Sequence, residues 1–140
     1  MNKITVAVIF GGNSGEHEVS IQSATAIISA LNPARYDIIP VKIERDGRWA
    51  LAPLLLAPEQ RASLPAELPE LIAPSACQKD MSIDVAFPIV HGTYGEDGCL
   101  QGLLEIAGIP YVGTGVLGSA LGMDKAVQKK LLRASGIPVV

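Results

Sequence analysis

Two junctions of one kind constrain the fold of this chain more than any other feature. A nearly unbroken apolar run over residues 4–10 leads into Gly11-Gly12, and a second run over 85–90 leads into His91 and a glycine-rich loop over 92–98. Continuous β-branched and apolar runs are typical of strands buried on both faces of a parallel sheet. Each junction is followed by an apolar pattern at helical spacing. We therefore expect strand, tight loop and helix N-terminus twice, the arrangement that binds ligands in open α/β sheets.

The patterns between and after these junctions complete an α/β fold. Residues 37–43 are predicted to form a strand, 45–48 a turn, and 49–51 a short strand that pairs back as a hairpin. Residues 52–82 hold five of the ten prolines and are expected to form a long loop with about one helical turn. Helices are predicted over 24–31, 97–107, 116–121 and 124–135, with a short strand at 111–112. This order indicates a mostly parallel, Rossmann-like sheet flanked by helices.

Composition and charge narrow the function classes. Charged residues make up 18% of the 140 residues, against about 25% in an ordinary soluble domain, and hydrophobic residues make up 49%. Either part of the surface is covered by something else, or the core is merely well packed. The net charge of -3 and the scarcity of basic clusters argue against a nucleic-acid partner. The apolar stretches are too short to cross a bilayer, so no membrane partner is expected.

The cysteines and the end of the chain give two further expectations. Cys77 and Cys99 lack metal-ligand spacing and are expected to be small, buried or half-buried thiols. Without a secretory signal they fit a reducing, cytoplasmic location. The sequence stops at 138–140, at the start of a strand-like segment, which predicts an amino-terminal piece of a longer protein. A natural end with a disordered tail is the alternative.

The first junction offers backbone amides and two carboxylates. The pair Gly11-Gly12 can expose N–H groups to an anion or allow close approach of a substrate, although a plain tight turn would also use it. Glu16 and Glu18 lie where a helix begins, so they either cap its amides or bind an ammonium group. His17 between them is expected to be solvated or hydrogen-bonded.

The second junction and the last helix offer a histidine and a lysine. His91 ends a buried strand at the ligand-binding edge of the sheet, where it could donate to a carboxylate or transfer a proton. Glu96 and Asp97 are expected to stabilise the loop and cap the following helix. Asp124 is a candidate N-cap. Lys125 is unfavourable beside a helix N-terminus, which a phosphate partner would explain, whereas the basic residues at 129, 130 and 133 are read as a solvated face.

Three blocks of sequence carry a family resemblance: residues 11–20 (GGNSGEHEVS), residues 91–102 (HGTYGEDGCLQG) and residues 119–125 (SALGMDK). In content, order and spacing they resemble the amino-terminal part of D-alanine–D-alanine ligases of the ATP-grasp superfamily. The segment over 45–82 is similar to the insertion found in longer members. The resemblance implies a pre-ATP-grasp domain over 1–122, and over 123–140 a linking helix and the start of the central ATP-grasp domain.

The resemblance also implies a reaction and residue roles. ATP would phosphorylate one D-alanine, and the amine of a second would attack the acyl phosphate to give a dipeptide precursor of peptidoglycan. Gly12, Glu16, Val19, Ser20 and His91 would bind the first D-alanine, with Glu16 at its ammonium group and His91 at its carboxylate. Glu16 and His91 would thereby be the catalytic residues of this part.

The nucleotide and its metal would be bound largely elsewhere. Lys125 would contact the ATP phosphates, while the ligands for Mg²⁺, or Mn²⁺ as an alternative, would belong to the central and carboxy-terminal domains that these residues lack. The second substrate, whether D-alanine, D-lactate or D-serine, is left open, as is a homodimer. A non-catalytic Rossmann-like module that binds a small molecule is the other interpretation.

Overall fold

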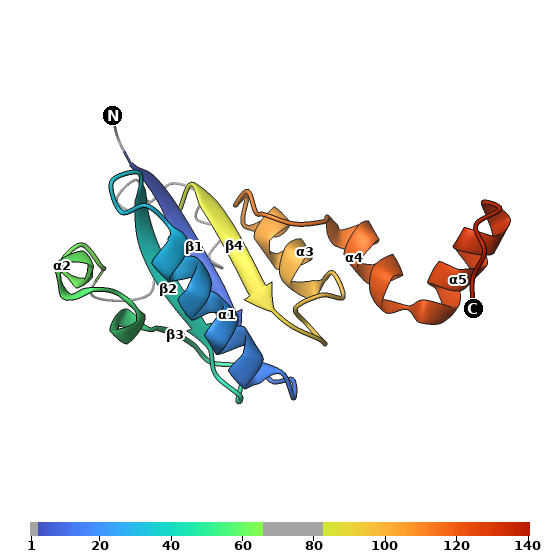
Figure 1. The fold of residues 1–140 in the computed structure, drawn as a ribbon, viewed down its shortest axis with the longest axis horizontal. Coiled ribbons are helices and arrows are strands. Elements are labelled where there is room, and N and C mark those ends of the chain that lie inside the picture. The colour runs from blue at the N-terminus through green and yellow to red at the C-terminus, as the bar shows by residue number, and fades with distance from the viewer. Residues whose placement is uncertain (1–2, 66–82) are drawn as a thin grey trace.

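The computed structural model describes residues 3–65 and 83–140, which form a four-stranded sheet with helices on both faces (Figure 1). The strands are β1 (Ile4–Gly11), β2 (Tyr36–Ile43), β3 (Trp49–Leu51) and β4 (Val85–Val90), and their order is β3-β2-β1-β4. β1 pairs in parallel with both β2 and β4, while β3 is antiparallel to β2. The predicted α/β class, the parallel sheet and the hairpin are confirmed.

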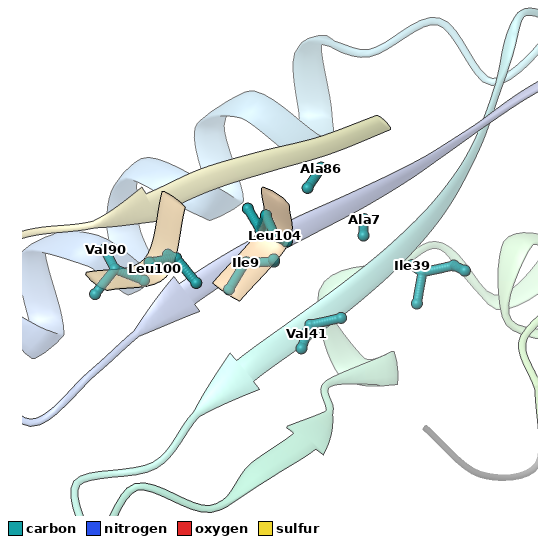
Figure 2. Packing of buried hydrophobic residues seen from close by; sticks show 8 residues of the cluster. All are labelled: Ala7, Ile9, Ile39, Val41, Ala86, Val90, Leu100 and Leu104. Atoms are coloured by element: carbon teal, nitrogen blue, oxygen red, sulfur yellow. The ribbon is translucent and has the colours of Figure 1, made fainter. Parts of the chain in front are cut away.

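The central strand β1 is apolar at almost every position because both of its faces are covered. Alternate residues of a strand point to opposite faces of the sheet. One face packs under α3 (Cys99–Ile106), and Figure 2 shows this cluster. The other face packs under α1 (His17–Ala30). The first cluster comprises Ala7, Ile9, Ile39, Val41, Ala86, Val90, Leu100 and Leu104; the second comprises Val6, Val8, Phe10, Ala24, Ile28, Ile38, Leu56 and Ile89.

The segment after the hairpin is less extended than a plain loop. It contains a 3-10 helix, η1 (Pro53–Leu55), and a short helix, α2 (Pro58–Arg61), so it holds more helix than the single turn predicted there. Leu56 between them is buried in the core under α1. Residues 66–82, which include Cys77, lie outside the described residues.

The predicted strand at Tyr111 and Val112 is reduced to one bridge. Tyr111 pairs with Ala86 at the edge of β4, where the Ala86 amide donates to Pro110 O and the Val112 amide donates to Ala86 O. Gly113 follows with φ +127°, a conformation outside the strand region, so the chain turns away after one pair. The strand prediction was therefore wrong in extent, although the pairing direction is parallel.

Two helices follow and lead away from the sheet (Figure 1). They are α4 (Val116–Met123) and α5 (Lys125–Ala134), and α5 makes its main contacts with α4. Asp124 caps α5 as predicted, because its Oδ1 accepts from the amides of Ala126 and Val127, each at 3.0 Å. In residues 3–65 and 83–140, no helix is both long and apolar enough to span a membrane.

Candidate functional site

The loops that follow β1 and β4 emerge side by side at one edge of the sheet. Gly11, the last residue of β1, is paired with Val90, the last residue of β4, and with Ile43 at the end of β2. From β1 the chain crosses through α1 to β2 on one side, whereas from β4 it passes through α3 to Tyr111 beyond the other side. Adjacent strands whose connections diverge in this way leave a crevice at their carboxyl ends, which is where open α/β sheets bind ligands.

The Gly11-Gly12 turn brings the first loop close to its neighbours. Both residues have positive φ, +93° and +94°, which side chains disfavour. A Cβ on Gly11 would collide with the Ile43 carbonyl oxygen, and one on Gly12 would stand 2.8 Å from Val90 Cγ1. The turn is therefore packed against both adjacent strands, and the Gly12 amide is used by a 2.8 Å hydrogen bond to Ile43 O.

Glu16 reaches across to the second loop. The place where a Cβ on Gly92 would stand is 3.2 Å from Ser14 Cβ and 3.8 Å from Glu16 Oε2. Glu16 is the N-cap residue of α1, yet its side chain makes no capping hydrogen bond. Ser14 Oγ instead accepts from the Glu16 amide at 3.2 Å. The exposed Glu16 carboxylate therefore does not cap α1, and within the described residues it lies beside the loop after β4.

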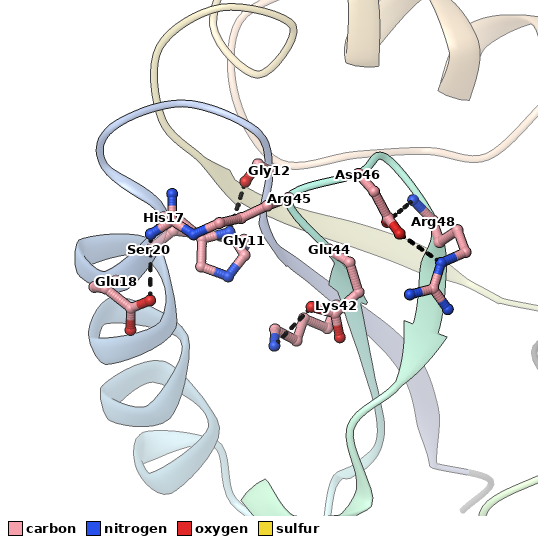
Figure 3. A network of polar contacts seen from close by, with 10 residues as sticks. All are labelled: Gly11, Gly12, His17, Glu18, Ser20, Lys42, Glu44, Arg45, Asp46 and Arg48. Atoms are coloured by element: carbon pink, nitrogen blue, oxygen red, sulfur yellow. Dashed lines mark hydrogen bonds and ion pairs between the residues drawn. The ribbon is translucent and has the colours of Figure 1, made fainter.

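The carboxylate of Glu18, the second acidic residue of this segment, pairs with a residue outside the crevice. Glu18 Oε1 lies 3.4 Å from Arg45 Nη2, an exposed ion pair that points toward the β2–β3 turn (Figure 3). Glu18 also lies in the first turn of α1, where a negative charge is favourable. Of the two carboxylates that the sequence singled out, only Glu16 extends toward the loop after β4.

The first turn of α1 contains backbone amides with and without hydrogen-bond partners beside the crevice. Ser20 is fully buried; its Oγ accepts from the Gly11 amide at 2.7 Å and donates to Ile89 O, and its own amide donates to Glu16 O. Val19 is 51% exposed, and within the described residues its amide has no hydrogen-bond partner. Val19 can therefore offer an N–H to an anion, whereas the amide and the hydroxyl hydrogen of Ser20 are already used within the fold.

His91 follows directly after β4, as predicted, and turns one nitrogen inward. Its Nε2 is buried and has no hydrogen-bond partner within residues 3–65 and 83–140. Its Nδ1 lies 3.9 Å from Glu96 Oε1. A buried polar atom without a partner is unfavourable unless a ligand or water completes it. This nitrogen is the strongest local indication that a polar group binds beside the loop.

Three side chains fix the loop that carries His91. Glu96 Oε2 accepts from the Gly92 amide at 2.7 Å, which supports the prediction that this carboxylate stabilises the loop. Asp97 accepts from Tyr94 at 2.9 Å and from Cys99 at 3.0 Å, so it stabilises the loop and also the start of α3. Gln101, which the sequence reasoning missed, is buried and donates from Nε2 to Gly95 O at 2.9 Å. Its spacing one helical turn after Asp97 places it toward the loop.

The pKa of Asp97 is lowered because the loop stabilises the ionised carboxylate. Partial burial raises this pKa, but the amides of Tyr94 and Cys99 stabilise the carboxylate and lower the pKa below the ordinary value overall. Cys99 itself is exposed, so the expectation of a buried or half-buried thiol was wrong for this residue. The adjacent Asp97 carboxylate raises the pKa of the Cys99 thiol, which disfavours the reactive thiolate.

Lys125 is not brought to the crevice by the described part of the chain. It is exposed at the start of α5, beyond α4 and away from the sheet (Figure 1). It forms no ion pair within residues 3–65 and 83–140. Lys129, Lys130 and Arg133 are also exposed, as expected of a solvated face. In the same residues, no group of three or more His, Cys, Asp or Glu side chains could hold a metal ion.

Comparison with known proteins identifies the family. The sequence profile described as "D-ala D-ala ligase N-terminus" matches residues 5–114. The chain belongs to this family. A D-alanine–D-alanine ligase of Rhodococcus erythropolis is 47% identical over 99% of this chain, and one of Solibacter usitatus is 44% identical over 99%. The resemblance inferred from the three sequence blocks is confirmed.

Solved structures of the family share the fold. The D-alanine–D-alanine ligase from Coxiella burnetii matches all of this chain with a TM-score of 0.84 at 42% identity. The VanG D-Ala:D-Ser ligase from Enterococcus faecalis matches 99% of it with a TM-score of 0.82 at 40% identity. This chain spans 43% of the Rhodococcus relative and 43% of each of these two structures. The matched region is therefore less than half of the ligases to which it is similar.

Proposed function

We propose that this chain is the amino-terminal, first-substrate half-site of an ATP-dependent ligase that joins two D-alanine molecules for peptidoglycan synthesis. The observation that carries the proposal is the approach of the Glu16 carboxylate to the loop that holds His91, at the carboxyl ends of β1 and β4. A carboxylate, an unused amide and an unpartnered imidazole nitrogen at one crevice suit an amino acid with its ammonium and carboxylate groups. The family membership supports the same assignment.

Each group would have a separate task. Glu16 would bind the ammonium group of the first D-alanine through a charge-assisted hydrogen bond. The Val19 amide, at the N-terminus of α1, would stabilise the substrate carboxylate. The His91 Nε2 would donate to that carboxylate, while its Nδ1 on the other side of the ring lies 3.9 Å from Glu96 Oε1. Gly12 would allow the substrate close to the backbone. The role of this part is to hold and orient the carboxylate that is to be activated.

The nucleotide would be contacted from this chain by one residue. We propose that Lys125 contributes a positive charge to the phosphates of ATP, because it is an exposed cation that forms no ion pair within the described residues. The described residues offer no cluster that fits Mg²⁺ or Mn²⁺. We therefore assign the metal to the remainder of the ligase and derive no step through it.

The domain division and the surroundings are part of the same proposal. Residues 1–122 would form the substrate domain, and residues 123–140 the linking helix that leads into the ATP-grasp domains. Exposed apolar side chains on α4 and α5, among them Leu117, Met123 and Leu131, support burial against those domains. We place the ligase in the cytoplasm, where ATP is available.

The test uses the intact protein that contains these residues. Phosphate release with ATP should depend on D-alanine and not on L-alanine, and one phosphate should form per D-alanyl-D-alanine detected by mass spectrometry. The 140-residue chain alone should form no dipeptide, because its described residues contain no metal-binding cluster and only one proposed phosphate contact, Lys125, to stabilise phosphoryl transfer. Binding of D-alanine by the intact protein without any ATP turnover would instead support a non-catalytic binding module.

A further inference from the structure

His17 is a buried polar residue beside the half-site to which the proposed function gives no task. It is 3% exposed, although it lies between two exposed glutamates. Its Nδ1 is 2.6 Å from Gly12 O (Figure 3). A carbonyl oxygen only accepts hydrogen bonds, so Nδ1 carries the proton and donates. The ring also lies against Gly11, where a Cβ would stand 3.2 Å from His17 Cε1.

The hydrogen bond from His17 is one of three attachments between the start of α1 and the strand ends. Ser20, one turn later on the same face, accepts from the Gly11 amide and donates to Ile89 O. The Gly12 amide donates to Ile43 O. The first turn of α1 is thus tied directly to the ends of β1 and β4, and only through Gly12 to the end of β2. His17 is the attachment closest in sequence to Glu16.

Glu16 depends on these attachments for its position. No hydrogen bond fixes its carboxylate within the described residues, and its amide is held only by Ser14 Oγ at 3.2 Å. Its reach toward Gly92 therefore follows from where the backbone of α1 begins. A shift of that backbone would therefore change the position of the carboxylate relative to the loop that carries His91.

We propose that His17 is a positioning residue for the first-substrate site: its Nδ1–H holds the Gly11-Gly12 turn and thereby sets the place of Glu16. This inference rests on the proposed function. It predicts that removal of the Nδ1 donor weakens use of the first D-alanine while leaving ATP use unchanged. Misplacement of a substrate-binding group by about 1 Å can cost up to about 100-fold in rate. We expect a loss of about 10-fold to 100-fold in kcat/KM for D-alanine.

Two substitutions by amide side chains distinguish the role of the Nδ1 hydrogen-bond donor from that of the imidazole ring as packing. In His17→Asn the side-chain nitrogen occupies the position of Nδ1, whereas in His17→Gln it occupies that of Nε2. The asparagine variant should keep most of the D-alanine kcat/KM, and the glutamine variant should show the loss. Ser29→Ala is the control, because the Ser29 hydroxyl lies in the same helix and donates only to Thr25 O. The KM for ATP should stay within about twofold in all three variants.

Hydrogen exchange supplies a readout that does not need turnover. Amides of residues 11–16 should exchange faster in His17→Gln than in His17→Asn or the wild type, whereas those of β2 should not change. Equal D-alanine constants and equal exchange in both variants would overturn the proposal, as would equal impairment of both, which would assign His17 to packing alone. If the intact wild type lacks D-alanine-dependent turnover, the proposed function fails, and the exchange comparison still decides whether His17 holds the turn.

Discussion

Substitution of Asp97 by asparagine tests how the loop that carries His91 is stabilised. The carboxylate accepts two backbone hydrogen bonds, from Tyr94 and from Cys99. Tyr94 has φ +67°, the one non-glycine residue with positive φ in the described part of the chain, so its conformation needs support from outside. An asparagine keeps one acceptor oxygen but turns an NH₂ group toward the other amide. One charge-assisted hydrogen bond is thus replaced by a donor facing a donor.

The magnitude follows from the type of bond that is lost. A hydrogen bond to a charged group contributes about 1.5–3 kcal/mol, and water can partly replace it at this half-buried loop, so we expect a loss of about 1–2 kcal/mol in the free energy of unfolding at pH 7. The pKa of Asp97 is lower in the folded chain than in the unfolded chain. Its stabilising effect is therefore present above the unfolded value of about 3.9 and is lost as the pH falls through the folded value.

Urea unfolding of the 140-residue chain, with and without the substitution, at pH 7 and at several values below 4, measures this effect. The difference between wild type and Asp97→Asn should shrink toward acid pH. Asp124→Asn is a matched control: asparagine caps helices about as well as aspartate, so this change should cost under about 0.5 kcal/mol. An Asp97→Asn chain as stable as the wild type at pH 7, or a difference that grows toward acid pH, would refute the reasoning.

Three further substitutions in the intact protein test the half-site. Glu16→Gln should mainly raise the KM for the first D-alanine, by the equivalent of about 1.5–3 kcal/mol for a lost charge-assisted contact; unchanged kinetics would leave Glu16 without a substrate role. His91→Ala should lower kcat by more than its effect on thermal stability explains; normal turnover with a lower melting temperature would make the histidine structural. Lys125→Ala should strongly raise the KM for ATP and barely change that for D-alanine; equal ATP affinity by calorimetry would remove it from the nucleotide site.

Most of the fold could be predicted because strong local patterns agree with the tertiary packing. The apolar run of β1 indicated burial on both faces, and it is the central strand. The Asp124 cap was predicted from local chemistry and is confirmed by two hydrogen bonds. The strand predicted at Tyr111 and Val112 was wrong in extent for a tertiary reason, because the pairing of Tyr111 with β4 ends after one residue. The burial predicted for the Cys99 thiol was wrong, because residue type alone does not determine on which face of α3 a side chain lies.

The site was less predictable than the fold. His91 was predicted as a site residue from its place after an apolar strand and Glu16 from its place at a helix start, but sequence could not show that Glu16 reaches Gly92 while Glu18 pairs with Arg45. For His17 two alternatives were predicted, solvated or hydrogen-bonded; the structure shows a hydrogen-bonded side chain, and its burial was not predicted. A signal was present nonetheless: the buried residues of α1 recur at helical spacing, namely His17, Ser20, Ala24 and Ile28.

The buried face of α1, formed by these four residues, connects the packing of the core with the geometry of the candidate site. Ala24 and Ile28 pack on the sheet, whereas His17 and Ser20, nearer the strand ends, are polar. A buried polar side chain is unfavourable unless it is hydrogen-bonded, so such residues persist only where backbone partners are within reach. The strand ends supply these partners at Gly11, Gly12 and Ile89. The buried face therefore changes from apolar packing to directional hydrogen bonds at the point where a displacement of α1 would move Glu16. Substitutions at its apolar end should thus affect mainly stability, and those at its polar end the geometry of the half-site.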